Sequence, residues 1–594
     1  VGNRTTARPL PTRRRRVRAR PDLVSCRSRM DFTSTYSYAS WDSVVFSPGS
    51  TFLAYVSGRS RTQVFVRVVG TLQVVRSWQL DACLDALEWS KDGLYLLASA
   101  YGLEKGVSFV LPLDPDVAVT DGSDDDRGWV ARISAVHGLL YATWLPLRRI
   151  PAVIQFAPFH TGAVIYSLAD QALTVLPATV LPCVFSHAMW PEHFATVQRH
   201  KEQDYLCLYT PHQTNAPSLE QPVEWDLWRA VRLHTNEISG AAWSPDGSIF
   251  AVWEHMLEYK LFAYTIFGTP QAAVTMQEDL IPHVAVPISA AECRATLTSP
   301  TDSGRARRVP VFSSTTSASR VSSMSTSLTK HRSSYSGDPK HLKTHGLGVR
   351  VVAWHPSSEF LAVGAYDDHV HILSRYDWSL VYLLDTNVAS LRNASPASLS
   401  VWQEPYRWFE ATSGRGIVPL NFSTTIPVDV PLQPSLAHEP LKSGTCWMAW
   451  NQDGSLLALR NEHTPSVVLL YEFVGIEERS VDAHIRAIAV IILSSPITSI
   501  MWRFGHLSSL ALVTGQSSVI CWTMNMSDHT QCCEAVAIPN EHFSATHIAC
   551  SPDGKTMLLA DAHTFCCVVS APNYDGNDDD LNEQRKTEGS QEAT

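Results

Sequence analysis

The sequence lacks the features that would place it among membrane-spanning, zinc-binding or familiar enzyme classes. Its longest apolar run, Ile485–Leu493, is interrupted by Arg486 and is far shorter than the ~20 residues that cross a bilayer, so we expect no membrane span. None of its 12 cysteines forms a Cys-x-x-Cys pair, which argues against zinc and redox sites. The chain contains no Gly-x-Ser-x-Gly, Gly-x-x-x-x-Gly-Lys, Gly-x-Gly-x-x-Gly or His-Glu-x-x-His sequence. We therefore predict a protein that is not an enzyme and has no catalytic residues, cofactor, metal or small-molecule substrate.

The charge of the chain is distributed unevenly along its length. The net charge is −10, yet residues 1–29 contain ten arginines and the single acid Asp22 and so carry +9, which leaves about −19 on residues 30–594. An acidic body repels nucleic acid, and we predict no nucleic-acid partner. A basic leader is typical of a transit peptide, a nuclear localisation signal or a nucleic-acid-binding arm. We favour a disordered leader, or one not translated natively, because the chain begins with Val1 and globular sequence begins at Met30.

A repeated pattern runs through the rest of the chain: an apolar segment ends in an aromatic residue, a polar turn follows, and a second apolar segment comes after the turn. Clear copies are 242–253, with Ser-Pro-Asp-Gly in the turn, and 352–373. Proline, aspartate and glycine each favour a tight turn, so each copy predicts a β-hairpin. We expect the residue before each turn to be a packing anchor within its repeat. These anchors are Phe46, Trp89, Trp144, Phe185, Trp243, Trp354, Trp450, Trp502 and Cys550.

The spacing of these anchors predicts the fold class. Most steps fit one repeat of roughly 40–45 residues with a variable loop, which is typical of four-stranded blades in a β-propeller. We predict an all-β protein: a WD40-type β-propeller that forms one large ring of seven to nine blades with disordered insertions. The predicted propeller spans 30–572, with insertions at about 268–347 and 386–445, and the acidic segment 573–594 is a disordered tail. The aromatic residues within 386–445 indicate either a docking strip or a loop packed on the rim, and we favour packing.

Several stretches resemble one family of WD-repeat proteins. Residues 251–270 and 346–381, with Leu-Glu-Tyr-Lys at 257–260, closely resemble the WD repeat-containing protein eight family, found at centrosomes and spindle poles. The resemblance covers most of 30–570. It implies a non-catalytic scaffold that binds a coiled-coil partner and, in fungi, a minus-end-directed kinesin, and that helps anchor microtubule minus ends and organise the mitotic spindle. It also implies a location in the cytoplasm, at the microtubule-organising centre of the cytoskeleton.

Two alternatives and one candidate surface remain at this stage. A translation-initiation scaffold can also have an enlarged propeller, and a propeller enzyme would need convergent acids, bases or histidines at its channel. For partner binding we expect a surface formed by charged and aromatic residues near turns, although a structural role within the blade is favoured for Asp367. The candidate partner-binding residues are Glu254, Glu258, Lys260, Tyr366, Asp367 and Trp378.

Overall fold

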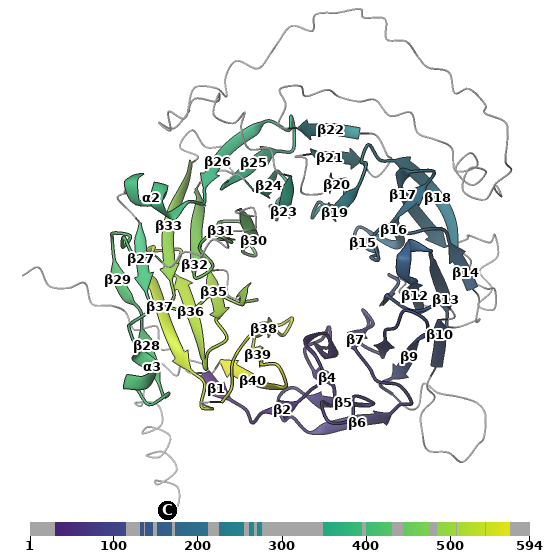
Figure 1. Ribbon diagram of the computed structural model, residues 1–594, viewed down its shortest axis with the longest axis horizontal. Helices are drawn as coiled ribbons and strands as arrows, with labels where there is room; N and C mark the ends of the chain where they lie inside the picture. Colours follow the sequence, from purple (N-terminus) through teal and green to yellow (C-terminus); the bar gives the residue numbers. More distant parts are fainter. Residues whose placement is uncertain are drawn as a thin grey trace, which may run out of the picture.

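Nine sheets surround a central channel and close into one ring (Figure 1). The computed structural model describes residues 30–114, 131–135, 137–146, 151–168, 173–211, 225–254, 260–265, 270–275, 348–366, 368–394, 399–430, 444–474, 484–505, 508–540 and 542–570. The prediction of an all-β propeller of seven to nine blades is confirmed, and the number is nine. The predicted leader 1–29 and tail 573–594 lie outside the described residues.

The first five blades each contain four antiparallel strands, which follow one another in chain order from the channel outward. Blade 1 consists of β3 (Val44–Phe46), β4 (Phe52–Val56), β5 (Gln63–Val68) and β6 (Val74–Gln79), and blade 2 of β7 (Ala86–Trp89), β8 (Tyr95–Ala100), β9 (Gly106–Pro112) and β10 (Ala131–Ala135). Blade 3 consists of β11 (Tyr141–Trp144), β12 (Ala152–Phe156), β13 (Ala163–Ser167) and β14 (Leu173–Leu176), and blade 4 of β15 (Phe185–His187), β16 (Trp190–His200), β17 (Gln203–Pro211) and β18 (Trp225–Arg232). Blade 5 consists of β19 (Ile238–Trp243), β20 (Ile249–Glu254), β21 (Lys260–Thr265) and β22 (Pro270–Thr275).

The remaining four blades include the widest sheets of the ring. Blade 6 consists of β23 (Val349–Trp354), β24 (Phe360–Ala365), β25 (His369–Ser374) and β26 (Leu380–Asp385), and blade 7 is built on β30 (Thr445–Trp450), β31 (Leu456–Asn461), β32 (Val467–Val474) and β33 (His484–Ile492). Blade 8 is built on β34 (Ser499–Trp502), β35 (Ser509–Val513), β36 (Ser518–Met524) and β37 (Gln531–Ala537). Blade 9 contains β38 (His547–Cys550), β39 (Thr556–Ala560) and β40 (Thr564–Ser570), with β1 (Met30–Phe32) and β2 (Tyr36–Ser37) paired to β40. Short helices η1 (Trp41–Ser43) and η3 (Pro158–His160) lie in loops.

The polar turns form as their residue types predict. In blade 5 the carboxylate of Asp246 accepts hydrogen bonds from the Ser244 hydroxyl at 2.5 Å and from the backbone N–H of Ser248 at 3.2 Å. Gly247 has φ of 68°, in the left-handed region that glycine adopts without a steric penalty. Blade 9 repeats this arrangement, with Ser551 donating to Asp553 at 2.6 Å and Gly554 at φ of 72°. Local chemistry thus sets the turn that joins the first two strands of a blade.

The anchor residues lie at the ends of the innermost strands. Eight of them are the last residue of their strand, whereas Phe185 is the first residue of the short and irregularly paired β15. Several indole N–H groups reach the neighbouring blade: Trp89 donates to the carbonyl of Val45 at 3.2 Å, and Trp144 donates to that of Glu88 at 3.1 Å. Trp450 and Trp502 make the same bond to the preceding blade at 3.2 and 3.0 Å. In each case the acceptor residue immediately precedes the anchor of the earlier blade, so these bonds link blade to blade.

The ring closes by joining the two ends of the propeller segment. Met30 pairs with Ser570 and Phe32 with Val568, so β1 lies along β40. Tyr38 adds a hydrogen bond of 2.7 Å from its hydroxyl to the carbonyl of Asp561. Because a strand from one end completes a sheet from the other end, unfolding blade 9 opens the ring.

The prediction that both insertions are disordered is wrong for the second one. Its described part contains α2 (Val388–Ala394), β27 (Ser400–Gln403), α3 (Trp408–Ala411), β28 (Ile417–Pro419) and β29 (Asn421–Ser423). β27 runs parallel to β33 and also pairs with β29, and β28 pairs with β37. The insertion therefore widens blade 7 to six strands and blade 8 to five.

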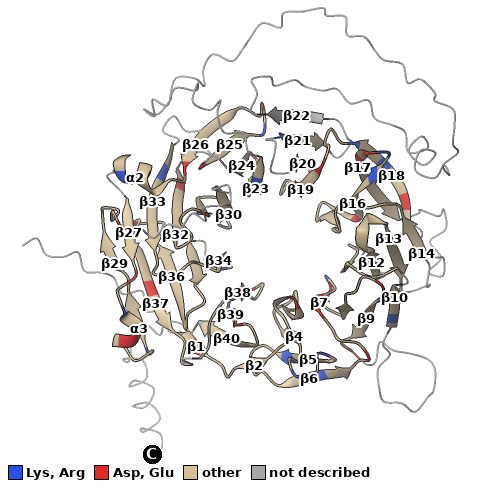
Figure 2. Cartoon of the chain, viewed as in Figure 1, with Lys and Arg blue, Asp and Glu red and all other residues tan. Residues whose placement is uncertain are grey.

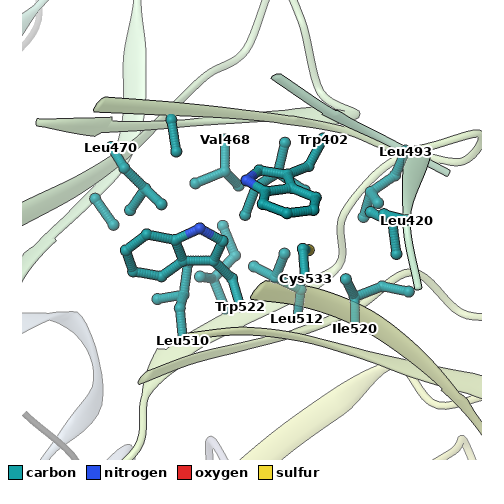
Figure 3. Close-up of a cluster of buried hydrophobic side chains, with 14 of the residues drawn as sticks. Trp402, Leu420, Val468, Leu470, Leu493, Leu510, Leu512, Ile520, Trp522 and Cys533 are labelled. Atoms are coloured by element: carbon teal, nitrogen blue, oxygen red, sulfur yellow. The ribbon is translucent and has the colours of Figure 1, made fainter. Parts of the chain in front are cut away.

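Apolar burial explains why this insertion is ordered. The ring of Trp402, from β27, packs with Val468 and Leu470 of blade 7 and with Trp522 of blade 8 in one cluster (Figure 3). Trp402 is 2% exposed and Trp522 is fully buried. The favoured interpretation of a loop packed on the rim therefore describes these residues, since burying aromatic area offsets the entropy cost of ordering a loop.

The first insertion begins later than predicted. Residues 270–275 form β22, the outermost strand of blade 5, because they pair with β21. The remainder of the predicted insertion, 268–269 and 276–347, lies outside the described residues. No helix in the part of the chain that the structure describes is long and apolar enough to cross a membrane.

Candidate functional site

The strand order gives the ring two distinct faces. The Ser-Pro-Asp-Gly turns lie on one face, where each innermost strand ends, and we call it the turn face. The loops between the second and third strands of each blade lie on the other, which we call the loop face. The loops after β20 and β24 belong to the loop face, so the candidate residues Glu254, Lys260 and Tyr366 lie there. Figure 2 shows acidic and basic residues scattered around the whole ring rather than gathered over one group of blades.

Glu254 does not lie on an exposed surface, which corrects the expectation from the sequence. It is 4% exposed, and its carboxylate accepts a hydrogen bond of 2.7 Å from the backbone N–H of Asn236. Lys260, the first residue of β21, forms an ion pair with it at 3.4 Å. The carboxylate turns inward because it satisfies a backbone donor at the start of its own blade. Glu258 lies outside the described residues.

Trp378 is also buried, and it lies on the turn face rather than beside the other candidates. It is 4% exposed and occupies the turn between β25 and β26 at φ of 56°. Its ring meets that of Trp354 edge-to-face, with the centroids 6.2 Å apart. The expectation that Trp378 is available to a partner is therefore wrong, because the turn directs the side chain into the core of its own blade.

Tyr366 remains accessible and lies at the boundary between blades 6 and 7. Its ring is half-buried, and the guanidinium of Arg350 lies 5.4 Å from the ring centroid. Arg350 also forms a close ion pair with Glu462 of blade 7. Asp367 lies outside the described residues. Lys260 and Tyr366 thus remain candidates for partner binding.

A pocket beside this boundary escaped the sequence analysis. We call it the blade 6/7 pocket, and its polar wall contains Asp368, Thr386 and Asn461. The side-chain amide of Asn461 donates to the carboxylate of Asp368 at 2.9 Å and to the hydroxyl of Thr386 at 2.8 Å. The other wall comes from the second insertion, through Val388, Arg392 and Val428. The adjacent aspartates after β24 were visible in the sequence, but the insertion's part in the pocket was not.

The blade 6/7 pocket is suited to holding a polypeptide. Arg392 is occupied by hydrogen bonds of 3.3 Å to the carbonyls of Pro427 and Val428, which fix the insertion beside α2. Val428 is 79% exposed and gives the rim an apolar side chain. No group of three His, Cys, Asp or Glu side chains in the described ranges is arranged to hold a metal ion. Exposed apolar and polar groups around a rigid rim can bind a partner without chemistry of their own.

The family comparison agrees with the propeller fold. Residues 338–374 match the family described as WD domain, G-beta repeat. The chain is thus a nine-bladed β-propeller, and one segment of it matches this repeat family. This propeller is 22% identical over 555 residues to WD repeat-containing protein WRAP73 of Mus musculus, with 88% of this chain and 92% of the relative covered.

The propeller also has weak likenesses among solved structures. Sqt1 from Chaetomium thermophilum is 11% identical, with 92% of this chain and 100% of that chain covered, at a TM-score of 0.40. Sqt1 of Saccharomyces cerevisiae is 9% identical, with 91% and 98% covered, also at 0.40. TM-scores this low do not bear on the function.

Proposed function

We propose that this WD-repeat propeller is a non-catalytic scaffold at the centrosome or spindle pole. In this proposal it binds a coiled-coil partner and, in some cells, a minus-end-directed kinesin, and it helps anchor microtubule minus ends and organise the spindle. The similarity to WRAP73 over most of both chains supports it, together with the family-like stretches 251–270 and 346–381. The second stretch supplies blade 6 and one side of the blade 6/7 boundary.

The observation that carries the binding role is the rim of the blade 6/7 pocket. Tyr366, Arg350 and Glu462 form a mixed aromatic and charged group at the blade 6/7 boundary, and Val428 adds an exposed apolar side chain to the pocket lining. A coiled coil buries its apolar a and d positions between its own helices and presents charged e and g positions beside them, and those charges can pair with a mixed aromatic and charged group. Aromatic and arginine side chains at this kind of boundary often dominate binding energy.

The test uses one variant at this rim and one matched control. Val428→Asp places a charge on a side chain that is 79% exposed, and Val175→Asp does the same on β14 of blade 3, where the side chain is 74% exposed. Substitutions at such exposed sites change the free energy of unfolding by no more than ~0.5 kcal/mol, so both proteins are expected to fold normally. Tagged chains are imaged through mitosis, and the proteins that co-purify are identified.

The expected result is a spindle-pole signal and a co-purified coiled-coil protein for the unchanged chain and for Val175→Asp, and loss of both for Val428→Asp. If folded Val428→Asp keeps both the spindle-pole signal and the co-purified coiled-coil protein, this rim is removed from the proposal. Absence of the unchanged chain from microtubule-organising centres throughout mitosis would refute the proposed function as a whole, and co-purified initiation factors or ribosomal proteins would favour the translation alternative.

A further inference from the structure

A second pocket lies on the loop face at the channel side of blades 1 to 3, away from the blade 6/7 pocket. It is lined by Trp41 and Asp42 of η1, by β7 through Glu88, and by Tyr101 and Tyr141. Figure 1 shows blades 1 to 3 across the channel from blades 6 and 7. We call it the Glu88 pocket.

Glu88 is held in place at the wall of this pocket. Its carboxylate accepts a hydrogen bond of 2.8 Å from the hydroxyl of Thr143 on β11, and the backbone N–H of Trp144 also donates to it. Burial raises the pKa of Glu88 to about 7, against the lowering effect of these two hydrogen bonds and of Lys91. The carboxyl group therefore changes its charge close to neutral pH.

The acidic groups of the pocket have no cation of their own. Asp42 is exposed, and neither Asp42 nor Glu88 makes an ion pair with a lysine or arginine in the part of the chain that the structure describes. Asp85 differs, because Arg61 pairs with it at 2.7 Å. Lys91 acts on Glu88 only at longer range. The pocket thus has two carboxyl groups available to a cation.

Aromatic rings supply the rest of the lining. Tyr141 is 36% exposed and Tyr101 is half-buried, and burial raises the pKa of both phenols, so both stay neutral. Trp41 stacks with His547 of blade 9, with the ring centroids 4.9 Å apart and the planes inclined by 23°. Neutral aromatic faces beside carboxylates attract a flat cation, since the ring faces carry negative charge density.

We propose that the Glu88 pocket binds an arginine side chain of a partner polypeptide. A guanidinium is planar, donates several hydrogen bonds in a fixed fork and stacks on aromatic faces, whereas an ammonium is compact and strongly hydrated. The two carboxyl groups in the lining can accept hydrogen bonds from a guanidinium, and the rings of Tyr101, Tyr141 and Trp41 in the same lining offer aromatic faces. This contact goes beyond the scaffold function, because it does not depend on where the protein lies in the cell.

Arginine binding is coupled to the charge of Glu88. The groups facing it are Asp42 from η1, Tyr101 after β8, Tyr141 and Thr143 from β11, and Lys91 from the turn after β7. With a pKa of about 7 in the free protein, Glu88 is mostly neutral at pH 6 and mostly ionised at pH 8. A bound guanidinium favours the ionised form, so binding releases a proton and the affinity should rise about tenfold from pH 6 to pH 8.

Calorimetric titration of the full chain tests the proposal. The probe is acetyl-Gly-Arg-Gly-amide, and its control contains citrulline, which has nearly the same shape but no charge. We expect saturable binding of the arginine probe, at least about tenfold weaker binding of the citrulline probe, and weaker binding of the corresponding lysine probe. Equal binding of the arginine and citrulline probes, or no saturable binding of the arginine probe, would overturn the proposal.

Three variants assign the binding to this pocket. Glu88→Gln keeps the shape of the side chain, and it should reduce affinity about tenfold at pH 8 and remove the pH dependence. Asp42→Asn changes an exposed residue and is expected to fold, so it tests the same pocket even if Glu88→Gln does not fold. It should weaken binding several-fold. Glu410→Gln on α3 is the control, since that side chain is 73% exposed and lies in the second insertion. Unchanged affinity in folded Asp42→Asn and Glu88→Gln, or an equal loss in Glu410→Gln, would contradict the assignment.

Discussion

Replacing Trp89 and Trp354 by phenylalanine compares an anchor that hydrogen-bonds to the neighbouring blade with one that does not. Both side chains are buried, at 7% and 9% exposure, so phenylalanine removes a similar apolar area at either site. The indole of Trp89 donates to Val45 at 3.2 Å, whereas the buried indole N–H of Trp354 has no hydrogen-bond partner among the described residues.

The difference between the two sites follows from this pairing. Trp89→Phe removes a hydrogen bond and leaves the carbonyl of Val45 without that donor, while Trp354→Phe removes a buried donor that is already unsatisfied. A net hydrogen bond is worth about 1 kcal/mol, and an unsatisfied buried polar group costs about 1–3 kcal/mol. Trp89→Phe should therefore lower the free energy of unfolding by about 1–2 kcal/mol more than Trp354→Phe.

Urea unfolding followed by far-ultraviolet circular dichroism measures this difference, because the signal reports strands and does not depend on the tryptophan that was replaced. Equal slopes against urea concentration are needed for the comparison. A loss at Trp354 equal to or larger than that at Trp89 would refute the view that the indole bonds between blades contribute to stability beyond the packing of the rings.

Two further predictions concern the second insertion and the turn of blade 5. Deleting 399–430 should lower the melting temperature by several degrees, because it uncovers Val468, Leu470 and Trp522. Deleting 300–340 should change the melting temperature by less than about 1 °C. Calorimetry measures both shifts, and equal shifts would contradict this prediction. Burial raises the pKa of Asp246, but hydrogen bonds from Ser244, Ser248 and Arg375 outweigh it and lower the pKa to about 2. Its ionised form therefore stabilises the fold above about pH 4, and this contribution should disappear as the pH falls from 4 to 2. In urea titrations at several pH values, the stability of Asp246→Asn should lack that pH dependence. If the free energy of unfolding of the two proteins changes equally with pH, the prediction is wrong.

The ring itself was predictable because its signals are local. A turn such as Ser244–Gly247 is specified by its own four residues, and the alternating strands on either side of it follow from a period of two. Nine such hairpins have few ways to bury their apolar faces other than against one another.

The second insertion was not predictable in the same way, because its partners are distant in the sequence. Val401 pairs with Val490 and Val418 with Ala535, and nothing within 386–445 indicates those neighbours. Strands of three or four residues are also too short to show a clear alternation of apolar and polar residues. They form because they pair with the outer edges of blades 7 and 8, and their own sequence does not indicate this pairing.

The burial of two candidate residues could not be predicted for a related reason. Sequence places Glu254 and Trp378 beside turns, but it does not show which way the side chain points. Glu254 is turned inward by the N–H of Asn236, and Trp378 by a left-handed backbone conformation that brings it to Trp354. The Glu88 pocket was hidden because its residues come from η1, β7, the end of β8 and β11, which only the closed ring brings together.

The positions of the two pockets limit how a partner can use this ring. Both open on the loop face, since Tyr101 and Asp368 follow the second strands of their blades and Tyr141 begins an innermost strand. They lie on opposite sides of the channel (Figure 1). An elongated partner, such as a coiled coil that carries a basic segment, can reach both only by crossing the channel mouth. Two weak contacts on one face raise the effective concentration of each for the other, so the ring can hold such a partner firmly.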